Sequence, residues 1–495
     1  MQPVVRPANR GLGSTDPISY LRSPGLDGKP GGRSSIFILR RKTGSFIKLF
    51  HEVKKIYWLL VTGTVMLVSC KEKKNDYQAI TKSSNLFSEV VYELNTVVMG
   101  NNFSPIVASR NYMYASVAAY EVIAAGYPSR FNSLAGQVNG LSRLPVPDTA
   151  KKIDYNYAAL LAFSKVGEAV TFPEGSMEVY TDSIKQMMKD HGMPTDVRDN
   201  SVAFADTISK VIIAWSKKDN YAQTRSAPKY TVIDTPGRWV PTPPAYTSGM
   251  EPHWQEIRTL VMDSSNQFVP PAPLEFNIKD KNSPYYKEVM AIKTAVDSLT
   301  PEQRHIANFW DDNPFKLNVS GHVSFGTKKF SPPGHWMAIV GIAAQKAKFD
   351  YAETVYAYVL TAIAQFDAFI QCWDQKYRSN TVRPETVINK YIDPEWQPLL
   401  QTPPFPEYTC GHSTVSSANA EALTAVFGDN FAYTDTSEQE FGIDKRSYTS
   451  FRAAAEENNW ARFYGGIHFH HSCIISTEYG AKVGQLVVAR LKLKK

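Results

Sequence analysis

The sequence predicts an all-α protein, and three observations lead to this expectation. From Asn85 onward, apolar residues recur at steps of three and four almost everywhere, which is the spacing of one helix face. Runs that alternate apolar and polar residues, as strands do, are nearly absent. A Pro-rich stretch at residues 235–254 cannot be helical throughout, so it divides the helices into two halves.

The first helical half is expected at residues 80–234. Apolar periodicity marks its helices, and Gly126-Tyr127-Pro128 and Gly192 are stop signals. The expected segments are Leu86–Val98, Ile106–Ala125, Asp154–Glu168, Gly175–His191 and Val197–Lys218.

The connector is expected at residues 235–282, and the second helical half at residues 283–495. Thr300-Pro301-Glu302-Gln303 predicts a helix start, because Thr caps, Pro suits the first helical position and Gln follows three residues after the cap. The other expected segments are a helix from near Ser283, one from Ala338 to Tyr377, and one over Thr414–Phe427 that ends at Gly428.

Composition and charge are those of an ordinary folded protein. The 495 residues are 43% hydrophobic and 20% charged, enough to bury a large core. The formal net charge is +7, but residues 1–69 hold 11 Lys or Arg and 3 Asp or Glu, and the remainder holds 43 basic and 44 acidic residues. Since the folded part has no basic excess, no nucleic-acid partner is expected. A positively charged site in the folded part must therefore be formed by a few residues at one place.

Residues 1–70 are expected to be a leader with a lipoprotein signal peptide. Lys54 and Lys55 precede the fourteen-residue apolar stretch Ile56–Ser69, and Cys70 follows it. A membrane-spanning anchor is the alternative, but a helix needs about 20 residues to cross a bilayer. We therefore expect an exported protein, lipid-anchored through Cys70 to a bacterial membrane, on the periplasmic or cell-surface side. Because this leader is unusually long, a start codon downstream of Met1 is expected.

Three further cysteines remain, which is an odd number for an exported chain and argues against a disulfide framework. They are Cys372, Cys410 and Cys473. A bridge between Cys410 and Cys473 stays open at this point.

The first of three polar segments places Lys376 seven positions before Arg383, which Pro384 follows. Two cations can then converge from a helix end and the loop after it. Alone this is weak evidence, because basic residues near a helix C-terminus usually only complement the helix dipole in water.

The second segment is Thr409-Cys410-Gly411-His412-Ser413, at the start of a predicted helix. Backbone N–H groups of Cys410 and Gly411 at a helix N-terminus would form an anion cradle. His412 could donate or accept a proton there, although taken alone it is more often a solvated capping residue.

The third segment places Arg462 six positions before His468, with Gly465 and Gly466 between them. The glycine pair predicts close backbone approach or a helix start. His470 and His471 follow, and we interpret them as a polar helix face or as support behind the site. Together the three segments supply one amine, two guanidiniums and two imidazoles, which suit a tetrahedral or trigonal-bipyramidal oxyanion.

The order and spacing of these residues resemble the signature shared by vanadium-dependent haloperoxidases and type 2 phosphatidic-acid phosphatases. In those families Lys-x6-Arg-Pro, Pro-Ser-Gly-His and Ser-Arg-x5-His-x3-Asp line one pocket. The resemblance covers about residues 85–490 and implies two packed helical bundles, as in vanadium chloroperoxidase. Trp239–Pro244, Phe309-Trp310 and Pro332–Trp336 resemble stretches of bacterial secreted haloperoxidases.

The resemblance also implies a role for each residue of the site. Trp373 and Phe405 match aromatic residues that haloperoxidases place around their vanadate. Lys376, Arg383 and Arg462 would neutralise the equatorial oxygens, Gly411 would donate its backbone N–H, His412 would be the acid–base residue, and His468 would bind vanadium or attack phosphorus.

Three positions depart from the family pattern. Cys410 stands where the family has Ser, so a weaker donor that peroxide can oxidise replaces a hydroxyl. Ala461 replaces the Ser before the Arg. Ser472 replaces the Asp four residues after His468, whose imidazole then needs another orienting partner; Asp367 is one candidate.

Two enzymatic functions and one non-catalytic function follow. A haloperoxidase would bind vanadate and use hydrogen peroxide and a halide, bromide or iodide in preference to chloride. An acid phosphatase or phosphatidic-acid phosphatase would need no cofactor and would act on a phosphate ester through a phospho-histidine. The third reading is a non-catalytic surface lipoprotein. The haloperoxidase is favoured, and the natural substrate and the oligomeric state stay open.

Overall fold

The computed structural model describes residues 75–314, 316–320 and 322–495. This part of the chain is 57% helix and 3% strand, with fifteen α-helices, so the predicted all-α class is confirmed. The predicted leader with Cys70 lies outside the described residues, and the division of the chain at residues 235–282 stays a prediction.

The helices of the first half follow the predicted order. They are α2 (Tyr77–Thr81), α3 (Ser84–Gly100), α4 (Pro105–Gly126), α5 (Tyr155–Ala169), α6 (Glu178–Asp190), α7 (Thr195–Ser216) and α8 (Tyr221–Ser226).

The second half contains the remaining helices and two antiparallel hairpins. Its elements are α9 (Pro284–Asp297), α10 (Pro301–Phe309), β1 (Lys316–Ser320), β2 (Val323–Thr327), α11 (Pro332–Ala347), α12 (Tyr351–Ser379), α13 (Pro384–Tyr391), α14 (Gly411–Phe427), β3 (Tyr433–Asp435), η2 (Ser437–Phe441), β4 (Arg446–Tyr448), α15 (Phe451–Tyr464) and α16 (His470–Arg490). The connector before it contains the short helix η1 (Trp254–Glu256).

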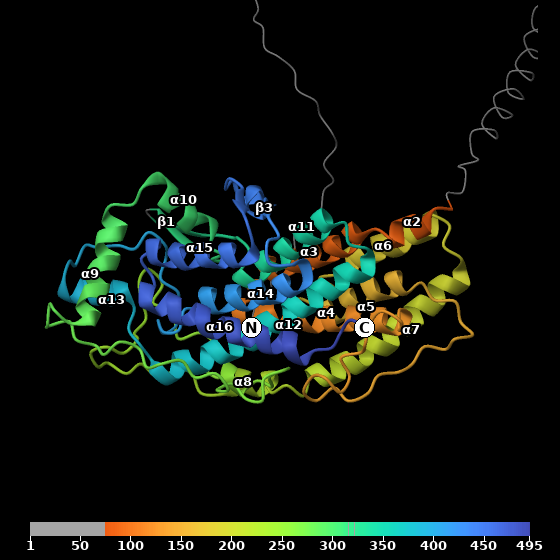
Figure 1. Cartoon of the computed structure of the whole chain (residues 1–495), viewed down its shortest axis with the longest axis horizontal. Coiled ribbons are helices and arrows are strands. Elements are labelled where there is room, and N and C mark those ends of the chain that lie inside the picture. The colour runs from red at the N-terminus through yellow and green to blue at the C-terminus, as the bar shows by residue number, and fades with distance from the viewer. Residues whose placement is uncertain (1–74, 315, 321) are drawn as a thin grey trace, which may run out of the picture. The chain divides into compact units, whose positions relative to one another are not determined.

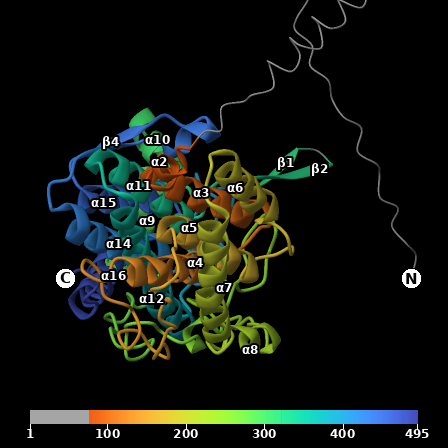
Figure 2. The same cartoon turned by 90° about the vertical axis from the view of Figure 1, so that its right-hand side faces the viewer.

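The two halves share a continuous hydrophobic core. Every residue of α4 from Ile106 to Ala124 is buried, and α4 packs against α5 and against α12 of the second half. Helices α5 to α7 lie at one end of the described residues and α9 and α13 at the other (Figure 1). In the view turned by 90°, α16 lies near α12, against which it packs (Figure 2). Helix α12 is long and apolar enough to cross a membrane, but these features reflect its burial in this core.

The single helix expected from Ala338 to Tyr377 is wrong, because the structure has two helices there. Lys348 adopts a left-handed conformation with φ 55° and ends α11. Asp350 then caps α12, and Glu353 completes a capping box with it. Apolar periodicity continues across the break, which is why the pattern alone did not reveal it.

Two glycines of α16 let it pack against the backbone of α14. A Cβ at Gly480 would lie 2.1 Å from the carbonyl oxygen of Thr414, and one at Gly484 would lie 2.5 Å from that of Ala418. Only glycine fits at such distances. This close packing places the first turn of α16 beside the N-terminus of α14, where the second and third polar segments meet.

The connector packs against the C-terminal end of α12. The backbone N–H of Trp239 donates to the carbonyl of Asn380, and the carbonyl of Met250 accepts hydrogen bonds from Trp373 Nε1 and Tyr377 Oη.

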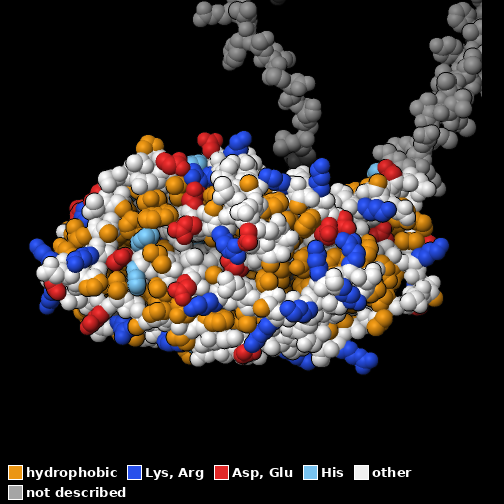
Figure 3. Space-filling model, in the orientation of Figure 1, with side chains coloured by type: hydrophobic (Ala, Val, Ile, Leu, Met, Phe, Trp, Pro, Cys, Tyr) orange, Lys and Arg blue, Asp and Glu red, His pale blue; other side chains and the backbone are white. Residues whose placement is uncertain are grey.

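Over the face shown in Figure 3, acidic and basic side chains are interspersed. This agrees with the nearly balanced charge of residues 70–495 and with a cationic site that is local.

Candidate oxyanion site

Helix ends bring the three polar segments of the sequence together. Lys376 lies in the last turn of α12, Arg383 caps α13, and His412 lies in the first turn of α14. Arg462 lies in the last turn of α15, and His468 precedes α16. The side chains of Lys376, Arg383, Arg462 and His468 are at most 2% exposed.

A loop between α13 and α14 holds two of the cations through its backbone. Lys376 Nζ donates to the carbonyls of Pro406 and Glu407 at 2.8 and 3.1 Å. Arg383 Nε donates to the carbonyl of Phe405 at 2.9 Å. Carbonyl oxygens orient a cation without neutralising it, so both charges remain available to an anion.

Two aromatic side chains form one wall of the site. Lys376 Nζ lies 4.9 Å from the ring centroid of Phe405 and 5.6 Å from that of Trp373, and the guanidinium of Arg383 lies 5.0 Å from the Phe405 ring. Such contacts stabilise cations at low exposure. The indole N–H of Trp373 donates to Met250, so Trp373 contributes its ring rather than a hydrogen bond.

Arg462 is held by backbone carbonyls of the segment after α10. Its Nη1 donates to the carbonyl of Trp310 and, at 3.4 Å, to that of Asp311. Its Nε is buried and has no hydrogen-bond partner among the described residues.

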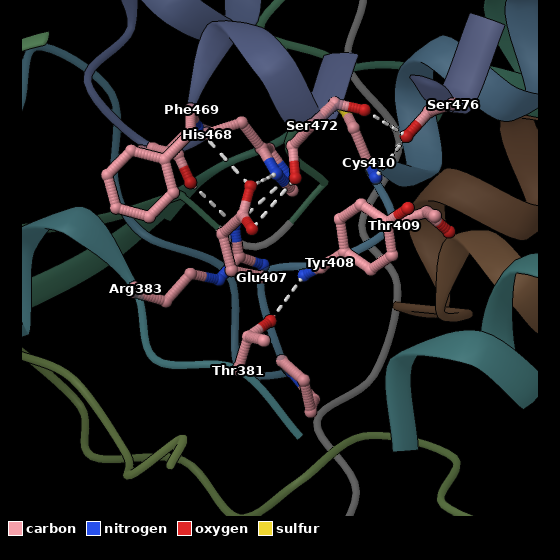
Figure 4. Close-up of polar contacts among 12 residues, drawn as sticks. Thr381, Arg383, Glu407, Tyr408, Thr409, Cys410, His468, Phe469, Ser472 and Ser476 are labelled. Carbon is pink, nitrogen blue, oxygen red and sulfur yellow. Dashed lines mark hydrogen bonds and ion pairs between the residues drawn. The ribbon is translucent and has the colours of Figure 1, made fainter. Parts of the chain in front are cut away.

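His468 is fixed at both ring nitrogens. Its Nδ1 lies 2.9 Å from Glu407 Oε1, and its Nε2 lies 3.0 Å from Nη1 of Arg383 (Figure 4). A guanidinium can only donate hydrogen bonds, so Nε2 accepts one from Arg383. Nδ1 therefore carries the ring proton and donates a hydrogen bond to Glu407. The lone pair of Nε2 therefore faces the cations.

Glu407 is the orienting partner of His468, and the sequence analysis missed it. Its Oε1 also accepts from the Phe469 N–H at 3.3 Å, and its Oε2 accepts from Ser472 Oγ at 2.9 Å. Ser472 thus supports the carboxylate instead of replacing it. The available signal was an acidic residue three positions before Cys410, just ahead of the second polar segment.

The suggestion that Asp367 orients His468 is wrong. Its carboxylate accepts the backbone N–H groups of Leu260, Val261 and Met262 at 2.7 to 3.0 Å, so it anchors the connector. Burial raises the pKa of Asp367 to about 6, against these hydrogen bonds, which lower it. Helical position alone did not show which way this side chain points.

The N-terminus of α14 faces the site, although one predicted donor does not. The Cys410 N–H donates to Ser476 Oγ at 2.8 Å and is unavailable to an anion, which corrects the expected cradle. Gly411 begins the helix, and a Cβ there would lie 3.5 Å from the Trp373 ring and 3.9 Å from Lys376 Cε. The first amides of a helix have no acceptor within it, so those from Gly411 onward supply the cradle.

Burial lowers the basicity of several groups here. It lowers the pKa of Lys376 to about 8 and that of Arg383 to about 10. Burial, followed by the charge of Arg462, lowers the pKa of His412 well below its usual range. His412 is partly buried, its Nε2 has no partner among the described residues, and the lowered pKa favours its neutral imidazole.

Three buried free thiols surround the start of α14: Cys372, Cys410 and Cys473. Burial raises the pKa of Cys410, but hydrogen bonding with Cys473 and the nearby His468 and His412 lower it well below the usual range of a thiol. The two thiols Cys410 and Cys473 are thus neighbours and unbridged.

His470 and His471 have their partners on α15 and α9. His470 stacks on Trp460 at 4.2 Å between ring centroids, and the His471 N–H donates to Glu288 Oε2 at 3.4 Å. They belong to the packing of α16 against α15 and α9, in line with the predicted helix face.

The site has the donors of an oxyanion pocket. Arg383 Nη2, Arg462 Nε and His412 Nε2 are all buried without a hydrogen-bond partner among the described residues. The two guanidinium nitrogens are donors, whose burial without partners is costly, and an oxyanion with several acceptor oxygens would satisfy them. Together with the imidazole of His468, these residues supply the donors, the positive charge and the nitrogen ligand that a vanadate-type oxyanion requires.

Comparisons with known proteins agree with this geometry. Residues 356–494 match the family model described as VCPO second helical-bundle domain. The crystal structure of the first bacterial vanadium-dependent iodoperoxidase is 42% identical, with a TM-score of 0.78, over 84% of this chain and 98% of that chain. Holo-type bacterial vanadium-dependent chloroperoxidase is 17% identical, with a TM-score of 0.60, over 79% and 93%, and shows a shared fold. No curated protein matched.

Proposed function

Because the chain belongs to the vanadium-dependent haloperoxidases, we propose that it oxidises iodide with hydrogen peroxide, using vanadate held at His468. One observation carries the residue assignment: His468 Nε2 accepts from Arg383 Nη1, and in the same group of side chains Arg383 Nη2 and Arg462 Nε are buried without a hydrogen-bond partner among the described residues. The finding that the chain is a haloperoxidase enzyme also makes the phosphatase and the non-catalytic interpretation the weaker ones.

Four side chains and one amide would hold the cofactor. His468 Nε2 would hold the vanadate, and Glu407 fixes the orientation of the imidazole by accepting from Nδ1. Lys376, Arg383 and Arg462 would balance the negative charge of the oxygens, with the amide of Gly411 as a further donor. When bound, vanadate activates hydrogen peroxide for attack by a halide without changing its own oxidation state.

His412 is suited to move the proton that peroxide must lose. Its lowered pKa favours the neutral imidazole, and among the described residues its Nε2 has no hydrogen-bond partner. Being only partly buried, it also lies where the site meets solvent. Aromatic walls at Trp373 and Phe405 keep bulk water from the cations, which strengthens their attraction for an anion.

The similar iodoperoxidase supports iodide as the halide, and iodide is also the most easily oxidised of the three common halides. The test uses purified protein with orthovanadate, hydrogen peroxide and iodide, bromide or chloride in parallel. We expect oxidation that requires vanadate, with kcat/KM highest for iodide. A higher value for bromide, or activity equal without vanadate, would refute the proposal, and a parallel phosphate-ester assay without vanadate checks the phosphatase alternative.

We also propose that the protein is exported and lipid-anchored through Cys70. The support is the sequence alone: two lysines, a short apolar stretch and a small residue before the cysteine. In a bacterial host, radiolabelled palmitate should be incorporated into the wild-type protein and not into Cys70→Ala. Equal labelling of both proteins would contradict the anchor.

A further inference from the structure

A second cluster of buried ionisable side chains lies next to the oxyanion site and has no part in the proposed function. Asp312 follows α10, His335 lies in α11, Asp435 in β3 and Glu438 in η2. All four are at most 2% exposed. The ring of Trp310 stacks on His335 at 4.7 Å between centroids and shields it from water.

His335 is surrounded by carboxylates at both ring nitrogens. Its Nδ1 lies 2.9 Å from Asp312 Oδ1 and 3.8 Å from Glu438 Oε1, and its Nε2 lies 2.9 Å from Asp435 Oδ2. The other oxygen of Asp435 accepts from the N–H and the hydroxyl of Ser437. Asp435 is therefore fully used in orienting His335.

The other carboxylates are not satisfied. Asp312 Oδ2 and both carboxylate oxygens of Glu438 are buried without a hydrogen-bond partner among the described residues. Two ammonium groups of this region, those of Lys316 and Lys329, lie 3.8 Å from Oδ2 of the neighbouring Asp311. Burying carboxylate oxygens without partners costs several kcal/mol per ion, roughly, unless a cation or a proton compensates.

We propose that Asp312, His335 and Glu438 bind one divalent transition-metal cation of the Zn²⁺ or Mn²⁺ class. Ligand atoms on such an ion lie about 2.0 to 2.2 Å from it, and hence about 3 to 3.5 Å from each other. The distances of 2.9 and 3.8 Å from Nδ1 to the two carboxylates bracket this range, and one ligand atom from each residue lies within 4.8 Å of the others.

The types of ligand atom also indicate which class of cation this site would bind. Nδ1 of His335 would be the metal ligand, and its Nε2–H is donated to Asp435, the arrangement in which a carboxylate fixes a metal-binding imidazole. One imidazole and two carboxylates suit Zn²⁺ or Mn²⁺, whereas Ca²⁺ and Mg²⁺ prefer oxygen ligands alone.

The bound cation would stabilise the segment that holds Arg462. Asp312 directly follows Trp310 and Asp311, whose carbonyls accept from Arg462 Nη1. Fixing Asp312 therefore fixes those two carbonyls. The cation would be a structural ion behind the oxyanion site and would take no part in halide oxidation.

The first test measures metal in the purified full-length protein, with any affinity tag removed and no chelator added. We expect close to one equivalent of zinc or manganese per chain by mass spectrometry, separate from any vanadium. Dialysis against a chelator should lower the Tm, and adding Zn²⁺ or Mn²⁺ should restore it. No bound metal and no Tm increase with either ion would overturn the proposal; recovery with Ca²⁺ or Mg²⁺ alone would overturn the His335 ligand.

The second test compares two glutamates of the same short helix. Glu438→Gln removes a ligand charge without changing side-chain size, and we expect its affinity for zinc or manganese to fall at least about tenfold. Glu440→Gln is the matched control, because Glu440 is exposed and accepts from Tyr92 Oη. Equal metal content in both variants would overturn the assignment, and the dialysis of wild-type protein decides the question if Glu438→Gln does not fold.

Discussion

Replacing Glu407 by Gln tests the support of His468 most directly. The carboxylate accepts from His468 Nδ1 at 2.9 Å, and Gln keeps the size and one acceptor oxygen but loses the charge. A hydrogen bond to a charged group contributes about 1.5–3 kcal/mol and a neutral one about 0.5–1.5 kcal/mol. The loss is thus about 1 to 1.5 kcal/mol, which corresponds to a roughly tenfold weaker vanadate affinity.

The assay is the vanadate Kd, measured by reconstituting activity in vanadate-free protein. At saturating vanadate the KM for hydrogen peroxide should change little, because Glu407 acts through His468 and does not contact the substrate. Asp367→Asn is the control: it removes a buried carboxylate that contacts only the connector backbone, so it should lower the Tm and leave the Kd unchanged. A Kd for Glu407→Gln within about twofold of wild type would refute this reasoning.

Three further predictions concern the oxyanion site. His468→Ala should abolish vanadate-dependent halide oxidation, since the axial ligand is lost; turnover like wild type at saturating vanadate would show that the site is wrongly assigned. Cys410→Ser should retain or raise activity and resist inactivation by excess peroxide, because the thiolate-prone sulfur is gone; a large loss of activity would mean that the thiol has its own role. Vanadate affinity should fall above about pH 8, because Lys376, with its pKa lowered to about 8, then loses the charge that attracts the anion; sulfate, whose charge is constant in this range, should compete with the same pH dependence, and a flat sulfate profile would contradict the role of Lys376.

The helices could be predicted from the sequence because their signals are local. The capping box at Thr300 and the end of α14 at Gly428 are formed by neighbouring residues, and both are present in the structure. The break at Lys348 was missed for a related reason. A non-glycine residue in a left-handed conformation leaves no mark in an apolar pattern that is buried on both sides of it.

Spacing and residue type also identified the side chains that the structure brings together around His468. They could not identify contacts set by side-chain direction or by distant backbone. Glu407 lies in the loop between α13 and α14 and contacts His468, which follows it by 61 positions in the sequence. The Cys410 N–H donates a hydrogen bond to Ser476 because α14 and α16 pack closely. That packing depends on two glycines with no chemical role in the site.

The loop at Phe405–Glu407 gives the empty site a particular kinetic character. Its three carbonyls already hold Lys376 and Arg383, and its one carboxylate already holds His468, before any anion arrives. An entering anion has to displace the Arg383 hydrogen bond at His468 Nε2, but it finds these side chains already oriented, so most of their rotamer entropy is lost during folding rather than during binding. Apoprotein stored without vanadate should regain activity on mixing, at a rate that depends on vanadate concentration and not on a slow rearrangement of the protein.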